Sequence, residues 1–170
     1  MATNLQFLQQ FKTDGKVTNF DITNIFDKGF TQYTITLNIN EASGDGYIGL
    51  HFFDASGNVI TESEYDLAGL ELKAETSFDG SWRTASTTQI APIITGGKAS
   101  VGGGATIQIF NADDTSSFTF VTAQSAMTNA SNLRGTKTIG VHKVAEKVSG
   151  VRFRVQSQTY DMTATVYGVK

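Results

Sequence analysis

The stretch that decides the fold is Ser149-Gly-Val-Arg-Phe-Arg-Val-Gln156 and, after a short polar break, Tyr160-Asp-Met-Thr-Ala-Thr-Val-Tyr-Gly-Val-Lys170. Apolar side chains occupy every second position in both parts: Val151, Phe153 and Val155, then Met162, Ala164 and Val166. Successive side chains of a β-strand point to opposite faces, so this alternation predicts two amphipathic strands, each with one buried and one solvated face. The chain therefore closes its fold with a hairpin that belongs to a sheet.

The same period of two recurs upstream, most cleanly where Tyr33, Ile35, Leu37 and Ile39 alternate with polar residues. The segment Asp54-Ala-Ser-Gly-Asn58 predicts a tight turn between two such runs. Further strands are expected at Leu5–Phe11, Ile48–Phe52, Leu67–Leu72, Phe78–Arg83, Thr87–Ile94, Thr106–Phe110, Ser117–Ala123 and Lys137–Val144. Counting the two ends, the pattern predicts about ten short strands of the usual length.

Little in the chain favours helix. The segment Thr23–Asp27, closed by Gly29, predicts one helical turn with Thr23 as its N-cap. Pro92 lies in an otherwise extended run. Because proline donates no hydrogen bond to a sheet, it predicts that this run lies at a sheet edge or at a bulge.

Composition agrees with a sheet protein. The chain has 170 residues, which suits one domain spanning residues 1–170, and a domain of that length buries roughly 70% of its unfolded surface. Charged residues make up 17% of the sequence, well below the usual ~25%. Glycine, threonine, serine, valine, isoleucine and phenylalanine are abundant instead. We expect an all-β fold, an antiparallel β-sandwich of jelly-roll type with little helix.

Charge and cysteine content exclude several classes of protein. A net charge of −3 and a pI near 5.3 argue against nonspecific nucleic-acid binding. The tight basic pair Arg152 and Arg154 is expected to be the solvated face of a strand, or to pair with acidic neighbours. The absence of cysteine rules out disulfides and cysteine-based zinc sites. The first residues lack a secretory signal pattern, and no run approaches the ~18 apolar residues of a membrane span, so we expect synthesis in a host cytoplasm without membrane association.

Six motifs follow one another along the chain. They are Val17-Thr-Asn-Phe-Asp-Ile-Thr-Asn-Ile-Phe26, Phe30-Thr-Gln-Tyr-Thr-Ile-Thr-Leu37, Leu50-His-Phe-Phe-Asp-Ala-Ser-Gly-Asn-Val-Ile60, Tyr65-Asp-Leu-Ala-Gly69, Ile107-Gln-Ile-Phe-Asn111 and the terminal Tyr167-Gly-Val-Lys170. In this order they resemble a family of tailed-bacteriophage virion proteins, common among phages of marine and cyanobacterial hosts. The resemblance implies a non-enzymatic virion component associated with the tail, baseplate or fibre. Capsid decoration, or a receptor-binding or carbohydrate-binding module of the tail, are the alternatives.

Such a role implies other virion proteins as partners, a virion localisation and a homo-oligomer, for which a trimer is one arrangement. Exposed strand edges invite pairing, so we expect assembly through strand edges and loops. Residues 1–16 and the glycine-rich loop 95–104 are candidate assembly arms. The alternative for the loop is a long flexible hairpin connection.

Catalytic constellations are missing from the sequence. The two histidines, His51 and His142, each lie in a predicted strand and are expected to be satisfied there; a zinc site would have to recruit carboxylates from distant turns. The acidic pairs Glu62 with Glu64 and Asp113 with Asp114 are expected to be solvated, with glycoside hydrolysis and weak calcium binding as the minor interpretations. We therefore expect no enzyme activity, no cofactor and no metal.

Exposed aromatic rings would support the carbohydrate-binding alternative. Trp82 lies among turn residues in Phe78-Asp-Gly-Ser-Trp-Arg83, where its ring could stack on a sugar. Tyr47, Tyr65 and Tyr160 are the candidates to join it on such a platform, with a host-surface glycan as the ligand. The competing interpretation places Trp82 in the core.

Overall fold

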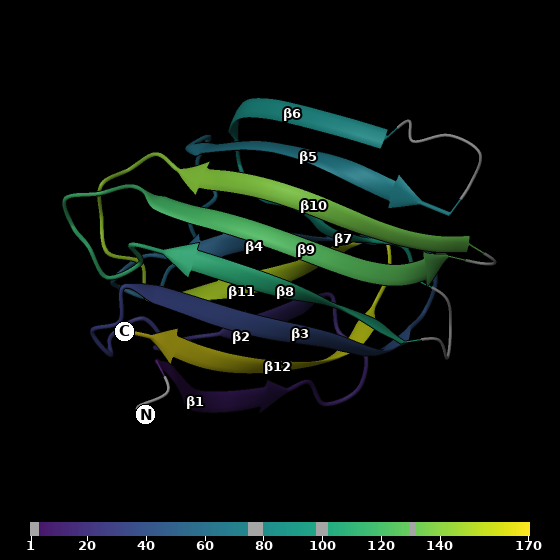
Figure 1. The fold of residues 1–170 in the computed structure, drawn as a ribbon, viewed down its shortest axis with the longest axis horizontal. Helices are drawn as coiled ribbons and strands as arrows, with labels where there is room; N and C mark the ends of the chain where they lie inside the picture. The colour runs from purple at the N-terminus through teal and green to yellow at the C-terminus, as the bar shows by residue number, and fades with distance from the viewer. Residues whose placement is uncertain (1–3, 75–79, 98–101, 130–131) are drawn as a thin grey trace.

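The structure is a computed structural model that describes residues 4–74, 80–97, 102–129 and 132–170. These residues form two antiparallel sheets and no helix, so the all-β prediction is confirmed (Figure 1). No helix in these ranges could cross a membrane. The described strands are β1 Leu5–Lys12, β2 Asn19–Ile22, β3 Gln32–Ala42, β4 Tyr47–Phe53, β5 Tyr65–Lys73, β6 Gly80–Thr87, β7 Ile90–Thr95, β8 Gly103–Phe110, β9 Thr119–Asn129, β10 Asn132–His142, β11 Gly150–Gln156 and β12 Tyr160–Val169.

The strand order contains a complete jelly roll. The large sheet runs β1-β12-β3-β8-β9-β10-β5-β6, and the small sheet runs β2-β11-β4-β7. If β5, β6, β9 and β10 are set aside, the two remaining sheets are β1-β12-β3-β8 and β2-β11-β4-β7, with four strands each. Paired sheets with this alternating order are the two Greek keys of a jelly roll, so the predicted architecture is confirmed.

Two insertions enlarge that jelly roll on one side. The pair β5–β6 is inserted between β4 and β7, and the hairpin β9–β10 is inserted between β8 and β11. Because β9 pairs with β8 and β10 pairs with β5, both insertions continue the large sheet beyond β8. The four strands β9, β10, β5 and β6, which form the upper half of the large sheet in Figure 1, are called the strand extension below.

The core lies between the two sheets, as the alternation predicted. Val151, Phe153 and Val155 are buried on β11, and Arg152 and Arg154 face outward. On β12 the buried set is Met162, Ala164 and Val166. The predicted hairpin of these two strands is wrong, because β11 lies in the small sheet and β12 in the large one. Pro92 lies on β7, at the edge of the small sheet next to a register shift, which confirms its predicted position.

The predicted helical turn at Thr23–Asp27 is wrong. The segment is irregular, because Asn24 adopts a left-handed φ of 57° and the Ile25 N–H donates to the Ser149 carbonyl across the chain. Ile25 and Phe26 are thereby turned into the core, where both are buried. Burial of two large apolar side chains outweighs one turn of helix propensity.

The two candidate arms have different outcomes. Within residues 1–16, Leu5–Lys12 is the edge strand β1, which pairs with β12 of the same chain and places Leu5 opposite Val169 (Figure 1). This segment is therefore part of the sheet. In the loop 95–104, Gly96 and Gly97 are buried and Gly103 begins β8; residues 98–101 lie outside the described residues.

Candidate functional site

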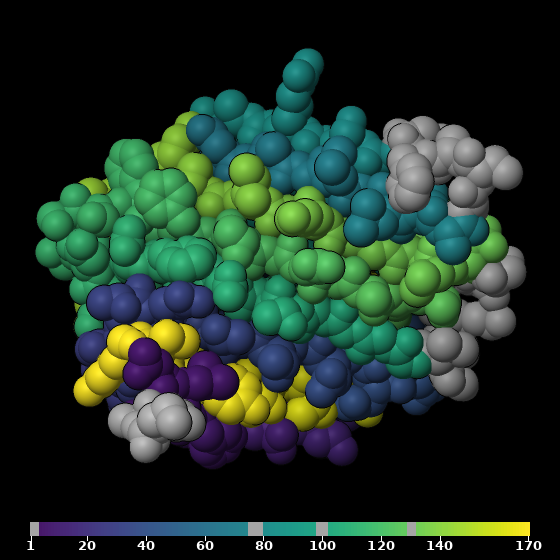
Figure 2. Space-filling model, viewed as in Figure 1, coloured from purple at the N-terminus to yellow at the C-terminus, as the bar shows by residue number. Residues whose placement is uncertain are grey.

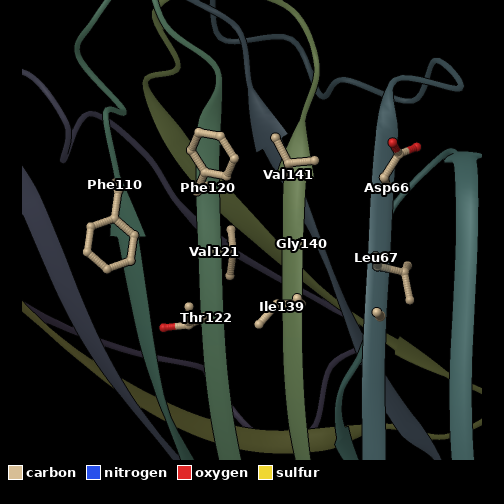
Figure 3. Close-up of a pocket in the computed structure, with 10 residues that line it drawn as sticks. Asp66, Leu67, Phe110, Phe120, Val121, Thr122, Ile139, Gly140 and Val141 are labelled. Atoms are coloured by element: carbon tan, nitrogen blue, oxygen red, sulfur yellow. The ribbon is translucent and has the colours of Figure 1, made fainter.

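The outer face of the strand extension carries apolar side chains in cross-strand rows. Cα pairing places Phe110 opposite Phe120, Phe120 opposite Val141, and Val141 opposite Asp66. Figure 3 shows this row crossing β8, β9, β10 and β5. The neighbouring row contains Gln108, Thr122, Ile139 and Ala68. The two rows line a shallow depression of about 380 Å³.

Large apolar side chains on this face are exposed to solvent. Phe120 is 45% exposed, Ile139 57%, Leu70 53% and Leu133 55%. These residues, with Leu72, Phe110 and Val141, define what we call the apolar face. In Figure 2 the strands that carry it run across the middle and upper part of the view. Contiguous exposed apolar surface of this kind marks interaction sites in soluble proteins.

The same side of the same sheet is polar over the jelly roll. There β3 presents Thr34, Thr36 and Asn38, and β12 presents Thr163 and Thr165. Within the described ranges, exposed apolar side chains return at the far edge, where Leu5 and Phe7 of β1 lie opposite Val169 and Tyr167 of β12. The apolar face is therefore concentrated on the inserted strands, and it reaches the adjacent jelly-roll strand β8 at Phe110.

Charge is sparse on this face. On β8, β9, β10, β5 and β6 the outward positions hold the charged residues Asp66, Lys137 and, on β6 opposite Ala68, Arg83. The Asp66 carboxylate accepts hydrogen bonds from Lys143 Nζ at 2.8 Å and the Ser86 N–H at 2.7 Å, and these donors lower its pKa. Asp66 is thus held charged at the β5 edge of the apolar face.

The sequence does indicate this face, because some of its strands carry apolar residues at both odd and even positions. Leu70 and Leu72 have opposite parity to the buried Leu67 on the same strand, and Phe120 has opposite parity to the buried Val121. A strand with apolar residues on both faces has either two buried faces or one exposed apolar face. The choice depends on what covers it, which a strand pattern does not specify.

Two of the proposed sugar-stacking residues are not on the surface, which corrects their assignment. Tyr65 and Tyr160 are fully buried. The Tyr65 hydroxyl accepts from the Phe52 N–H and donates to the Ile60 carbonyl, and burial raises its pKa. The Tyr160 hydroxyl donates to the Gly96 carbonyl, and burial raises its pKa to about 12. Each tyrosine uses its ring for the core and its hydroxyl to satisfy buried backbone.

The other two aromatic candidates lie apart from each other. Trp82 on β6 covers Gly69 of β5, where a Cβ would come within 2.4 Å of the indole nitrogen. Its ring is half-buried and packs against the core, as the competing interpretation held. Tyr47 on β4 is 38% exposed, but it lines a different depression from Trp82. The structure does not bring the four aromatic residues together as one platform.

His51 and the basic pair lie on the outer side of the small sheet. Arg152 donates two hydrogen bonds of 2.6 Å to the Asp21 carboxylate, so the expected pairing with an acidic neighbour is found. His51 is 3% exposed, and its Nδ1 has no partner among the described residues, contrary to the expectation of a satisfied histidine. Burial, and then the positive charges of Arg154 and Arg152, lower the pKa of His51 to about 4.

His142 is the side chain here that could hold a metal. Its ring is fully buried beside Tyr65, and its Nε2 faces two carboxylates, at 3.2 Å from Glu64 Oε2 and 3.7 Å from Glu146 Oε1. Its Nδ1 has no partner within the part of the chain that the structure describes, so the expectation of a satisfied histidine is wrong. The acidic pairs separate: Glu64 joins His142, Asp113 pairs with Lys147, and Asp114 accepts from Ser116.

No family model matches the chain. No curated protein matches it either. Among solved structures, the CBM2 module of the evolved Dit of Lactobacillus casei BL23 phage J-1 aligns with a TM-score of 0.27 and 7% identity, over 89% of this chain and 68% of that one. A TM-score this low carries no argument about fold or function.

Proposed function

We propose that this chain is a non-enzymatic structural component of a tailed-phage particle, and that it docks onto a neighbouring virion protein through the apolar face of its strand extension. The virion role rests on the ordered motifs that end in Tyr167-Gly-Val-Lys170. The docking surface rests on one observation: the inserted strands expose Leu70, Phe120, Leu133 and Ile139, whereas β3 of the jelly roll presents threonine and asparagine on the same sheet face. A location in the tail, baseplate or fibre is preferred to one on the capsid.

Surface burial supplies the mechanism. Apolar surface removed from water contributes about 25 cal/mol per Å², and the central side chains of an interface carry most of its energy. Phe120 and Ile139 lie on adjacent strands in adjacent rows at the centre of the apolar face, next to the depression (Figure 3). They are the side chains expected to anchor a partner. Assembly through strand edges and loops stays a prediction beside this mode.

The test is incorporation of variants into particles of the phage that encodes the chain. Ile139→Asp with Phe120→Ser places polar groups at the centre of the face, and Thr36→Asp is a matched control on the polar part of the same sheet face. The double variant should keep the wild-type circular dichroism spectrum and yet be depleted from purified particles at least tenfold. The control should enter normally.

Two results would reject parts of the proposal. Normal incorporation of the folded double variant would remove the apolar face as the contact. Absence of the wild-type chain from purified particles would remove the virion role. Immunogold labelling of intact particles separates a tail position from the alternative of capsid decoration, and sedimentation velocity of the purified chain measures whether it forms a trimer by itself.

Carbohydrate binding is the alternative of a different class, and it now depends on Trp82 and Tyr47 alone. Glycan-array binding that is lost in Trp82→Ala, with the fold retained, would favour it. Equal signals from the wild type and this variant would remove Trp82 from any glycan site.

A further inference from the structure

We propose that Glu64, His142 and Glu146 form a Zn²⁺ site that ties the two inserted strand pairs to the jelly roll. Zinc prefers imidazole nitrogen and carboxylate oxygen in the absence of thiolate, and sites with three protein ligands leave a fourth position for water. The chain provides one imidazole and two carboxylates, with one ligand atom from each lying within 4.8 Å of the others.

The distances fit a tetrahedral ion. Zinc bonds of about 2.0–2.1 Å place neighbouring ligands of a tetrahedron roughly 3.3–3.4 Å apart. The Nε2 atom of His142 lies 3.2 Å from Glu64 Oε2 and 3.7 Å from Glu146 Oε1. Only the two carboxylates need to approach each other by a small side-chain movement, and both are about one-third exposed and free to make it.

Charge supports the same conclusion. Within the described residues the ion pairs of Glu64 and Glu146 are with His142, and neither carboxylate has a lysine or arginine partner. Two carboxylates this close repel each other unless a cation lies between them. A divalent ion bound to all three groups supplies that charge.

The imidazole is held rigidly for this task. His142 is fully buried, with its ring centroid 5.1 Å from that of Tyr65 and 6.1 Å from that of Phe52. Its Nε2 is directed to the carboxylates, and its Nδ1 lies in the core without an acceptor among the described residues. Zinc-bound histidines normally donate this second N–H, and loss of such a partner weakens binding about 10–100-fold. We therefore expect a dissociation constant on the order of 1–100 µM.

The position of the three ligands gives the site a structural purpose. Glu64 precedes β5 and so stands at the start of the first insertion. His142 is the last residue of β10 and ends the second insertion, and Glu146 lies in the return segment to β11. The Lys143 N–H already donates to the Glu64 carbonyl at 2.8 Å, so the two junctions touch. A bound ion would link the start of β5 to the end of β10, beside the row that contains Val141 and Asp66.

The test uses the full chain, free of any affinity tag, stripped with EDTA and titrated with ZnCl₂ by calorimetry. One ion per chain should bind, and zinc a hundredfold above the dissociation constant should raise Tm by roughly 5–10 °C. Glu146→Gln and Glu64→Gln should each weaken binding at least tenfold. Glu62→Gln, an exposed glutamate of the same loop, is the matched control and should bind as the wild type does.

X-ray absorption of the zinc-loaded chain gives a second readout, with one imidazole and otherwise oxygen ligands expected. His142→Gln should abolish that signal, and circular dichroism reports whether this buried variant folds. The site is rejected if zinc fails to bind or to raise Tm, or if Glu146→Gln, Glu64→Gln and Glu62→Gln all bind zinc as the wild type does. An ion bound without imidazole also rejects it.

Discussion

Phe153 is the residue on which the small sheet depends most directly. It lies in the central strand β11, between Phe20 of β2 and Leu50 of β4, and it is fully buried. Its ring centroid lies 6.5 Å from that of Phe20. Phe153→Ala should lower the free energy of unfolding by about 3–5 kcal/mol, because it leaves a cavity in a closed core.

Arg154→Ala is the control for that measurement, because Arg154 is the next residue on the same strand and its side chain is exposed. Its cost should stay within about 0.5 kcal/mol, as is usual for surface substitutions. Urea unfolding of the two variants at one pH makes the comparison. Equal losses would contradict the assignment of the strand faces.

His51 gives the fold a specific pH dependence. Its pKa is about 4 in the folded chain against 6.5 ordinarily, so the folded state binds fewer protons than the unfolded state between these values. The stability contributed by neutral His51 is therefore fully present above pH 6.5 and is lost as pH falls toward 4. The loss should amount to about 3 kcal/mol.

The measurement is urea unfolding from pH 8 to pH 4 for the wild type and His51→Gln. Every other titrating group is common to both proteins, so the difference between the two curves isolates His51. Parallel curves across this window would show that the histidine does not titrate with a lowered pKa.

At the scale of elements, two hydroxyl groups join the strand extension to the small sheet. Thr136 and Thr138 on β10 donate to the carbonyls of Ile93 and Pro92 on β7, at 2.5 and 2.7 Å. Ser125 of β9 completes the chain of bonds, with its hydroxyl 2.7 Å from that of Thr136. These bonds lie between the two layers, which also meet through the Tyr65 hydroxyl at the Phe52 N–H and through apolar side chains.

Thr136→Val should therefore destabilise the chain by about 1–3 kcal/mol, since it leaves the buried Ile93 carbonyl without its donor and removes the hydroxyl–hydroxyl bond to Ser125. Thr106→Val, at an exposed position on β8, keeps the chemistry of the change and should cost less than about 0.5 kcal/mol. Thermal unfolding of both variants tests this. A similar shift for both would show that the inter-sheet bond contributes nothing.

For the whole molecule, the architecture predicts an order of local stability. The strands β3, β11 and β12 lie within the sandwich, and each pairs with a strand on both sides. At the opposite end, β6 pairs only with β5 at the sheet edge, and its residues are half-buried or exposed. Local opening requires less energy where little apolar surface is buried.

Hydrogen exchange of backbone amides measures that order. We expect the amides of β6 to exchange first, β5, β9 and β10 later, and β3, β11 and β12 last, near the rate of global unfolding. Zinc bound at Glu64, His142 and Glu146 should slow exchange at the β5 and β10 ends that carry the ligands. Uniform protection from β6 to β12 would contradict a jelly roll with a less stable extension.

The sequence by itself determined most of the strands, their buried faces and the class of fold, but it did not predict β2. Alternation in Val151–Val155 and Tyr33–Ile39 settles these because side-chain direction in a strand follows from covalent geometry. The buried positions of Val151, Phe153 and Val155 agree with it. The sequence likewise predicted the edge position of Pro92, because proline has no N–H to donate to a neighbouring strand.

Only the tertiary structure decided which strands are neighbours and which faces are covered. The exposure of Ile139, the burial of Tyr65 and Tyr160, and the meeting of Glu64 with His142 across 78 residues depend on that pairing. A local pattern states that a side chain points to one face of its strand. What covers that face is contributed by residues distant in the chain, so the candidate site became visible only when the two insertions were placed side by side.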